Sequence, residues 1–532
     1  MSSFVWADKP AGLTTHTSLN ESDRRPWTDT NDGFVEWLSA RLGIPLFPVH
    51  RLDRETTGII AFARDRETAA RAREAFEGRE VSKEYLLVTD RALKTFTSTA
   101  AFTSTFKFTS ENEFEVSSFI ERDGNAFVSR KDREPNAHTK FEKIRTEGRF
   151  TLWRAIPLTG KPHQIRLHAE DAGIPLLGDS QHAGTEFPAV CLHANKITLE
   201  GETHSAPPPI YFEKLDLLND RRLTRWLASC DRRERTNRNV HVNVQTLRWL
   251  HTESDPLRVE QLGEVLSLNW FRDTYPTDEE WKSITKLLEL KNWRIWYLQI
   301  RADRGKDPHT DRTLHSEPPP PERWTAQENE LTYEFRRETG LSPGLFLDQR
   351  QNRKWIQETS AGQRVLNLFC YTGGFSVAAA SGGAAQVVSV DVSKTFLDWA
   401  KRNFELNNLS IEPHEFRAID SGEYLAWAAK KGLKFETVIC DPPSFARTNT
   451  RGKSKVFKIE NEFETLLKAC AAVATKRILF STNFEQWTLD DLAKRAQSAL
   501  GARARVVATP SADLDFELPR QPRNMKSIVI EL

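Results

Sequence analysis

Residues 365–380 read VLNLFCYTGGFSVAAA, and this stretch decides the fold of the C-terminal part of the chain. Val365–Phe369 has the apolar composition of a buried strand, Gly373 and Gly374 allow a tight turn, and the alanine-rich run favours a helix. A strand that passes through a turn into a helix is the repeating unit of a doubly wound α/β sheet. Ligands of such sheets bind at the C-terminal ends of the strands, so the turn at Gly373 is a candidate ligand site.

Further apolar runs support the same sheet and are predicted strands at 387–390, 437–440, 477–480 and 527–530. The first of them ends at Asp391, whose carboxylate can accept hydrogen bonds from both ribose hydroxyls of a nucleoside cofactor. Ser393 can then cap a helix. The glycine pattern is not GxGxxG, so a pyrophosphate loop and a nicotinamide oxidoreductase are disfavoured. From these residues alone, a strand–turn–helix with no cofactor stays open.

The stretch Asp441-Pro442-Pro443-Ser444-Phe445 follows another predicted strand, on the same edge of the sheet. Its prolines fix the backbone, and an aromatic ring beside them can stack on a flipped base. Together with GLFLDQR at 344–350, LNLFCYTGGF at 366–375 and VSVD at 388–391, this stretch resembles the RlmK/RlmI group of 23S rRNA methyltransferases. These are class I enzymes that use S-adenosylmethionine. The resemblance covers about 336–532.

The resemblance implies roles for residues that follow the strand ends. It places the cofactor S-adenosylmethionine among Phe369, Tyr371, Gly373, Asp391 and Asp420. It places Asp441 near the methyl transfer centre, and it implies RNA contacts for Pro442 and Phe445.

The methylated atom can be partly predicted from the cysteines. Methylation of carbon 5 of cytosine needs a cysteine nucleophile, which cytosine-modifying members carry in an FSCS-type motif. The corresponding stretch here is Phe480-Ser481-Thr482-Asn483. Cys370 and Cys440 are more typical of buried strand cysteines. Methylation of a ring nitrogen needs only in-line positioning, so a purine of 23S rRNA, most simply guanine, is favoured, and cytosine carbon 5 stays the alternative.

A second polar cluster lies near the N-terminus, where residues 48–60 read PVHRLDRETTGII directly before an apolar strand. Lys83-Glu84-Tyr85 and LTGKPHQIRLH at 158–168 lie downstream. Taken separately, these motifs are compatible with a turn aspartate and surface arginines. An Asp and an Arg could also form a buried charge pair beside an aromatic ring.

With KPAG at 9–12, AHT at 137–139, GD at 178–179 and LHA at 192–194, these motifs resemble the RluA-type pseudouridine synthases over about 5–213. The resemblance implies that Asp53 is the catalytic aspartate, that Arg166 pairs with it, and that Tyr85 stacks on the base. It also implies that Arg51, with His50 beside it, contacts RNA and fills the gap left by the flipped uridine. It implies no cofactor for this half.

The expected fold is multidomain. An α+β pseudouridine synthase domain with a mixed antiparallel sheet (1–215) precedes a basic linker (216–241), a small α/β RNA-binding domain (242–335) and a Rossmann-like methyltransferase domain (336–532). We expect strands of the small domain at 262–268 and 293–297. Within it, residues 219–238 carry seven arginines against three acidic residues, so this segment is either a solvated helix or linker, or a strip that contacts RNA phosphates.

The composition limits the classes of protein. The apolar share is 39%, which is too high for a disordered chain, and no run of about 18 apolar residues predicts a membrane span. No secretory signal is visible, and five separated cysteines without a CxxC pair favour the reducing cytoplasm. The net charge of +1 argues against a nucleic-acid partner only until its distribution is considered. We expect a monomer without metal.

These observations predict a bifunctional enzyme. The N-terminal half would isomerise uridine to pseudouridine in rRNA or tRNA, and the C-terminal half would methylate a base with S-adenosylmethionine. The alternative is that only one half is catalytic and the other is an RNA-binding module.

Overall fold

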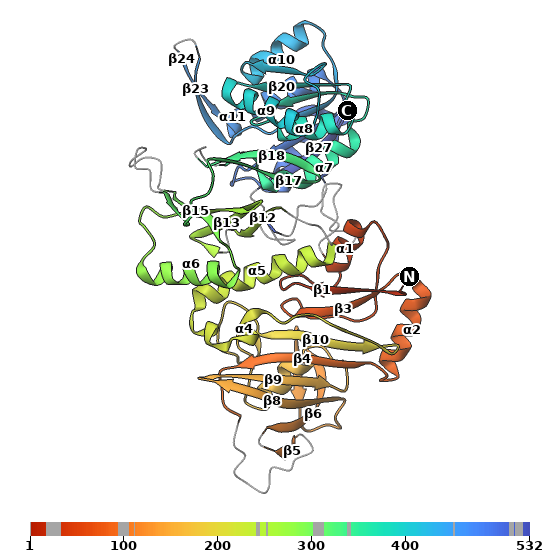
Figure 1. Cartoon of the computed structure of the whole chain (residues 1–532). Coiled ribbons are helices and arrows are strands. Elements are labelled where there is room, and N and C mark those ends of the chain that lie inside the picture. Colours follow the sequence, from red (N-terminus) through yellow and green to blue (C-terminus); the bar gives the residue numbers. More distant parts are fainter. Residues whose placement is uncertain are drawn as a thin grey trace.

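A computed structural model describes residues 2–17, 33–93, 106–110, 112–240, 245–251, 254–301, 313–337, 342–450, 453–509, 515–516 and 525–532. The described residues form three sheet-containing parts that follow one another along a long axis (Figure 1). The N-terminal sheet lies at one end, a small sheet lies in the middle, and the C-terminal α/β sheet lies at the other end. The predicted multidomain fold is confirmed.

The N-terminal sheet has eleven strands, of which eight follow the order β1-β3-β10-β4-β9-β8-β6-β5. Only β3 and β10 pair in parallel among its described pairs, so the sheet is mixed and mainly antiparallel, as predicted. Its strands are β1 (Phe4–Lys9), β2 (Phe47–Pro48), β3 (Thr57–Ala63), β4 (Ser82–Thr89), β5 (Phe106–Ser110), β6 (Glu113–Asp123), β7 (Ala126–Arg130), β8 (Ala137–Glu147), β9 (Phe150–Pro157), β10 (Leu192–Leu199) and β11 (Glu202–Ser205). Its helices are α1 (Phe34–Leu42), α2 (Arg66–Glu77), α3 (Gln164–Asp171) and α4 (Ile210–Glu213), with short 3-10 helices η2 (Ser180–His182) and η3 (Leu215–Asn219).

The segment predicted as a basic linker is instead the 20-residue helix α5 (Arg221–Val240). Figure 1 shows α5 between the N-terminal sheet and the small sheet. Trp226 and Leu227 are buried in one hydrophobic core with Leu86 of β4 and Leu250 of the small sheet. Because this core is continuous, the two parts are packed together and are not joined by a solvated segment.

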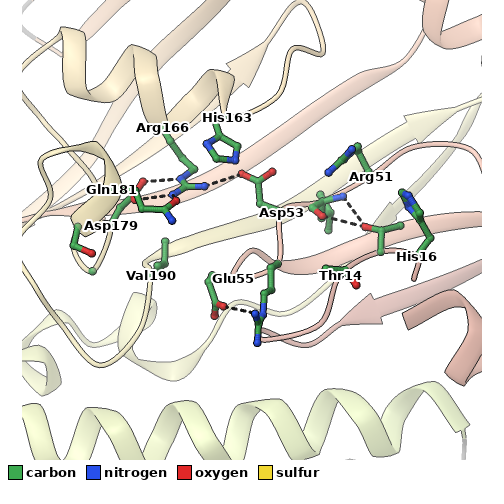
Figure 2. Close-up of a pocket in the computed structure, with 15 residues that line it drawn as sticks. Thr14, His16, Arg51, Asp53, Glu55, His163, Arg166, Asp179, Gln181 and Val190 are labelled. Carbon is green, nitrogen blue, oxygen red and sulfur yellow. Dashed lines mark hydrogen bonds and ion pairs between the residues drawn. The ribbon is translucent and has the colours of Figure 1, made fainter. Parts of the chain in front are cut away.

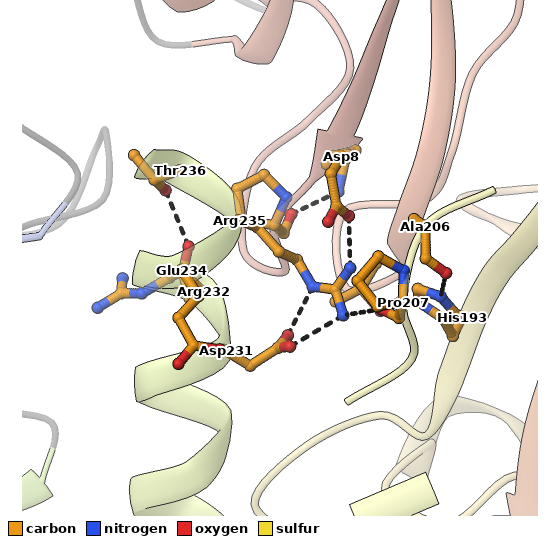
Figure 3. A network of polar contacts seen from close by, with 12 residues as sticks. Asp8, His193, Ala206, Pro207, Asp231, Arg232, Glu234, Arg235 and Thr236 are labelled. Atoms are coloured by element: carbon orange, nitrogen blue, oxygen red, sulfur yellow. Dashed lines mark hydrogen bonds and ion pairs between the residues drawn. The ribbon is translucent and has the colours of Figure 1, made fainter. Parts of the chain in front are cut away.

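Three of the seven arginines in the predicted solvated or phosphate-contacting strip are instead buried in α5, whereas Arg221, Arg225 and Arg238 are exposed. Arg232, Arg233 and Arg235 are buried, and the last two are fully so. Figure 3 shows Arg235 directed at Asp8 and Asp231. These carboxylates replace water around the guanidinium, which is why a charge run can lie in a protein interior.

The small sheet has the strand order β12-β13-β14-β15-β16 and one helix, α6 (Asp278–Leu290). Its strands are β12 (Thr246–Leu250), β13 (Leu257–Leu262), β14 (Val265–Trp270), β15 (Ile295–Ile300) and β16 (Thr313–His315). The prediction of one strand over 262–268 is wrong, because Gly263 adopts a φ of +69° and turns the chain between β13 and β14. A hairpin of β17 (Arg323–Glu328) and β18 (Leu331–Arg336) leads into the C-terminal domain.

The C-terminal sheet has the order β21-β20-β19-β22-β25-β27-β26, and its first five strands are parallel. The strands are β19 (Arg364–Leu368), β20 (Gln386–Asp391), β21 (Glu415–Ala418), β22 (Phe435–Cys440), β25 (Ala474–Thr482), β26 (Arg505–Ala508) and β27 (Lys526–Glu531). The helices are η5 (Leu347–Gln349), α7 (Arg350–Thr359), α8 (Gly374–Ser381), α9 (Lys394–Leu406), α10 (Ser421–Lys430), α11 (Ile459–Val473), α12 (Leu489–Leu500) and η6 (Gly501–Arg503). Two hydrophobic cores lie on the two faces of this sheet, which confirms the doubly wound prediction.

A hairpin of β23 (Phe445–Thr450) and β24 (Lys453–Lys458) projects from the C-terminal domain (Figure 1). Among the described residues, no helix is long and apolar enough to cross a membrane.

Two candidate active sites

Asp53 lies in the loop before β3 and faces two adjacent cavities of about 580 and about 540 Å³. Arg51, Leu52, His163 and Arg166 line both cavities with it. Figure 2 shows the larger cavity, with Arg166 and Asp53 pointing toward one another across it. The structure thus brings together three of the residues predicted from motifs far apart in the sequence.

The buried ammonium of Lys9 holds the loop that carries Asp53. Its Nζ donates to the carbonyls of Pro10, Arg54 and Thr56 at 2.9–3.0 Å. Burial lowers the pKa of Lys9 to about 7. Arg54 and Thr56 both follow Asp53 in the loop, so Lys9 of β1 ties this side of the loop to the sheet.

The N-terminal side of the loop is held in the same way. The Thr15 hydroxyl both donates to the carbonyl of Leu52 and accepts from its N–H, each at 3.0 Å. His50 Nε2 accepts from the N–H of Ala61 at 3.0 Å, and burial lowers the pKa of His50 to about 3, so its ring is neutral. Arg51 is exposed at the mouth of the cavities. Of the two residues predicted to contact RNA, Arg51 is exposed to solvent, whereas the His50 side chain is hydrogen-bonded to β3.

Arg166 on α3 has a carboxylate partner that the sequence reasoning did not assign. Its Nη1 lies 3.4 Å from Asp53 Oδ2. Its Nε and Nη2 donate to the two oxygens of Asp179 at 2.6 and 2.7 Å, and Nη2 also donates to Gln181 Oε1 at 3.0 Å. The guanidinium is therefore held bidentately from behind, with one edge left for Asp53.

Tyr85 on β4 lines the smaller cavity together with Asp53, Ile165 and Leu192. Burial and the charge of Asp53 raise the pKa of Tyr85, so the phenol stays protonated at neutral pH. The aromatic ring and the aliphatic side chains beside the Asp53 carboxylate suit a planar, uncharged base.

The C-terminal site is a cavity of about 610 Å³ at the ends of the parallel strands. Most of the predicted cofactor and methyl-transfer residues line it, namely Phe369, Tyr371, Asp391, Asp420, Asp441 and Pro442. Asp391 ends β20, where its carboxylate accepts from the N–H groups of Tyr371 at 3.0 Å and Ser393 at 2.9 Å. Burial raises the pKa of Asp391. Asp420 caps α10 through the N–H groups of Gly422 and Glu423.

The loop between β19 and α8 is conformationally strained. Phe369 and Tyr371 have φ values of 54° and 49°, which non-glycine residues seldom adopt. Gly373, at a φ of 78°, does not line the cavity. A Cβ there would lie 2.7 Å from the Cβ of Ala400, so this glycine allows α9 to approach the loop.

The other end of the cavity holds two carboxylates, Asp441 and Asp348. Gln349 Nε2 donates to Asp441 Oδ2 at 3.1 Å, while Asn352 donates to the Oε1 of Gln349 at 2.6 Å and so fixes its amide. Burial and the charge of Asp348 raise the pKa of Asp441 to about 7. One oxygen of Asp348 is buried without a hydrogen-bond partner. The sequence reasoning included 344–350 in a motif but assigned Asp348 and Gln349 no role.

The aromatic residues of this site differ from the predicted one. Phe445 is 53% exposed at the start of β23 and does not line the cavity. Phe457, in the paired strand β24, lines it and packs 5.9 Å from the ring of Phe369. Phe346, which is 45% exposed, lines it too. The pairing of β23 with β24 brings the ring of Phe457 to the cavity, and no local sequence motif indicates this pairing.

The residues present fit a nucleoside bearing a sulfonium. The Asp391 carboxylate suits ribose hydroxyls, and Val392 and Leu425 supply apolar contacts beside it. Tyr371, with Phe396 packed against it at 4.5 Å, supplies an aromatic face that attracts a cation. Among the described residues no cysteine lines this cavity; Cys370 and Cys440 are buried, and burial raises the pKa of both thiols.

Comparison with known proteins finds one family match in the N-terminal part of the chain and a different one in the C-terminal part. Residues 3–171 match the family model for RNA pseudouridylate synthase, and residues 262–475 match the one for S-adenosylmethionine-dependent methyltransferase. The chain is 47% identical to ribosomal RNA large subunit methyltransferase K of Neisseria meningitidis over 154 residues. This aligned region makes up 29% of this chain and 43% of the relative. It is 40% identical over 185 residues to ribosomal RNA large subunit methyltransferase K/L of Dichelobacter nodosus. These residues make up 34% of this chain and 24% of the relative.

The chain thus spans less than half the length of these curated relatives. Among solved structures, SMU.776 complexed with SAH is similar at a TM-score of 0.50 and 25% identity, covering 58% of this chain and 82% of that one.

The fold, the sites and the comparisons agree on two different kinds of domain in one chain. The N-terminal part resembles the RNA pseudouridylate synthase family over residues 3–171, and the C-terminal part resembles the S-adenosylmethionine-dependent methyltransferase family over residues 262–475. The two resemblances predicted from the motifs are confirmed.

Proposed function

We propose that this chain is a bifunctional RNA-modifying enzyme that forms pseudouridine with its N-terminal half and methylates a base of 23S rRNA with its C-terminal half. The observation that carries the proposal is that each half has its own cavity with a carboxylate at its centre. Asp53 with Arg166 and Tyr85 forms one, and Asp391 with Asp441 forms the other.

In the N-terminal site, Asp53 attacks the bound uridine so that the base detaches, rotates and reattaches through carbon 5. Arg166 pairs with Asp53 at 3.4 Å and orients this nucleophile. Tyr85 stacks on the base beside Asp53. The exposed Arg51 occupies the gap that the flipped uridine leaves in the RNA. The substrate is rRNA or tRNA, and this half needs no cofactor.

In the C-terminal site, Phe369, Tyr371, Asp391 and Asp420 hold S-adenosylmethionine, which supplies an electrophilic methyl group when bound. Asp441 lies at the acceptor end of the cavity and accepts a proton from the methylated base. Guanine presents N–H donors on its Watson–Crick edge, which suit the paired carboxylates Asp348 and Asp441. The lack of a lining cysteine among the described residues weighs against cytosine carbon 5.

Two variants test the proposal on the full-length protein. Asp53→Asn should abolish pseudouridine formation and leave methylation unchanged, whereas Asp391→Ala should weaken S-adenosylmethionine binding and leave pseudouridine formation unchanged. Liquid chromatography of the nucleosides separates pseudouridine from its isomer uridine, and mass spectrometry of the same rRNA and tRNA digests detects the added methyl group. Isothermal titration measures cofactor binding. Methylation without pseudouridine in the wild type would support the alternative that the N-terminal half only binds RNA.

The proposed partner is RNA, and the proposed site of action is the cytoplasm, with the chain acting as a monomer. The comparisons that support an RNA partner are the rRNA methyltransferases, which share 40–47% identity with part of the chain.

A further inference from the structure

Asp179 is the closest carboxylate to Arg166, although it does not lie at the reacting end of the site. It forms two hydrogen bonds with the guanidinium at 2.6 and 2.7 Å, against one contact of 3.4 Å between Arg166 and Asp53. Asp179 is 1% exposed, and both of its oxygens are occupied by Arg166. It therefore cannot itself contact a substrate.

The turn that carries Asp179 is fixed by its backbone. Gly178 adopts a φ of +91°, and a Cβ there would lie 2.0 Å from the carbonyl oxygen of Ala189. The Asp179 carbonyl accepts the N–H groups of His182 and Gly184 at 3.1 and 2.9 Å. The position of the Asp179 carboxylate is thus set independently of Arg166.

Gln181 completes the arrangement from the same turn. Its Oε1 accepts from Arg166 Nη2 at 3.0 Å, and both residues line the larger cavity beside Asp53. Three of the hydrogen bonds of the guanidinium are therefore made to one rigid turn, so its plane is determined before RNA binds. Figure 2 shows Arg166 between this turn and Asp53.

We propose that Asp179 is a positioning residue for uridine isomerisation, which orients the Arg166 guanidinium so that its Nη1 edge faces Asp53. Gln181 assists it from the same turn. A guanidinium without this support could rotate away from Asp53, because the single contact at 3.4 Å does not fix its plane. The inference rests on the proposed pseudouridine synthase activity.

The test compares Asp179→Asn, Asp179→Glu and Gln181→Ala with the wild type in steady-state pseudouridine formation on RNA. A matched control is Asp171→Asn, since Asp171 lies on the same helix as Arg166 and pairs with Lys131 and Ser129 away from Asp53. We expect Asp179→Asn to lower kcat about 10- to 100-fold with KM for RNA unchanged, as for other supports of catalytic groups. Asp179→Glu should recover part of the rate, and Asp171→Asn should retain it.

Thermal unfolding and methylation are measured on the same samples. A wild-type kcat in Asp179→Asn, or a loss no larger than in an equally destabilised Asp171→Asn, would overturn the inference. If Asp179→Asn fails to fold, Gln181→Ala decides, with a smaller fall in kcat expected and an unchanged kcat overturning it. A wild-type protein without pseudouridine synthase activity, or an active Asp53→Asn variant, would instead overturn the proposed function.

Discussion

Arg235 in α5 and Asp8 in β1 form a buried ion pair, although 227 positions separate them in the chain. Arg235 also donates to Asp231 at 2.7 and 2.9 Å, and Asp8 accepts from Arg238 as well. Asp8 directly precedes Lys9, whose ammonium holds the loop of Asp53. Helix α5 is thus connected through β1 to the support of the N-terminal site.

The same helix reaches the C-terminal domain. Arg233 Nε donates to the carbonyl of Asp515 at 3.0 Å, and the Asp515 carboxylate accepts from Arg350 at 3.2 Å. Arg350 follows Gln349, which donates to Asp441. A second direct contact joins Arg41 of α1 to Gln351 of α7 at 2.7 Å. The two cavities therefore belong to one packed body and not to two tethered domains.

The first prediction concerns the Arg235 ion pair. Arg235→Met should lower the free energy of unfolding by about 3–5 kcal/mol, because it leaves Asp231 buried without its guanidinium partner and leaves Asp8 with Arg238 alone. Urea unfolding followed by fluorescence measures the change. Arg225→Ala, at an exposed position of the same helix, is the control and should lie within about 0.5 kcal/mol of the wild type. Equal effects of the two variants would contradict the structural role of the pair.

The second prediction concerns Lys9. Lys9→Met removes the donor from three buried carbonyls, at a cost on the order of 1–3 kcal/mol for the groups left unpaired. Because two of these carbonyls, those of Arg54 and Thr56, lie just after Asp53 in the same loop, pseudouridine formation should fall by more than methylation does. Both modifications are measured on digests of one RNA sample by liquid chromatography with mass spectrometry. Lys196→Met, at an exposed position of β10, should alter neither, and an active Lys9→Met would show that β1 does not hold the loop.

Much of the C-terminal fold could be predicted because its patterns are local. Val365–Phe369, Gly373 and Ser393 each indicate a strand, a turn or a cap within a few residues, and the structure has β19, the turn and α9 there. The arginines of α5 could not be interpreted in this way. Whether Arg235 is solvated or buried depends on Asp8, which lies on another element, so a charge run alone is compatible with either.

In the candidate sites, too, local motifs identified some residues, whereas residues brought in by packing between elements were missed. The motifs identified Asp53, Arg166, Asp391 and Asp441, and the structure brings each pair to a common cavity. They did not identify the partners of these residues. Gln349 reaches Asp441 from 92 positions away, and hairpin pairing brings Phe457, which no motif indicated, to the cavity. Such contacts follow from packing between elements, which no single motif contains.

The third prediction concerns Gly373. Gly373→Ala should destabilise the C-terminal domain by more than the roughly 1–2 kcal/mol expected from its positive φ, because its methyl group would lie 2.7 Å from Ala400. Gly362→Ala is a matched control, since Gly362 has a φ of +69° and no atom within 4 Å of its Cβ position. Thermal unfolding of both variants separates the cost of the positive φ, which both share, from the cost of the contact with Ala400, which only Gly373→Ala makes. Equal losses in the two would mean that α9 can move away without cost.

The fourth prediction is a pH dependence of methylation that Asp348 controls. The pKa of Asp441 is raised to about 7, so the carboxylate that accepts a proton is depleted below that pH, and the single-turnover rate should rise as pH increases through about 7. Asp348→Asn removes the neighbouring negative charge and should move the midpoint to lower pH, while Arg353 and the Gln349 hydrogen bond still favour the ionised form.

Stability provides an independent measurement of the same titration. The folded chain holds the Asp441 proton up to about pH 7, whereas an unfolded aspartate releases it near 3.9. The folded state therefore binds more protons between these values, and the contribution of Asp441 to the free energy of unfolding falls as pH rises through this window. Asp441→Asn should abolish both the rate profile and this slope. A methylation rate that is independent of pH from 6 to 8 in the wild type, at unchanged S-adenosylmethionine binding, would exclude Asp441 as the proton acceptor.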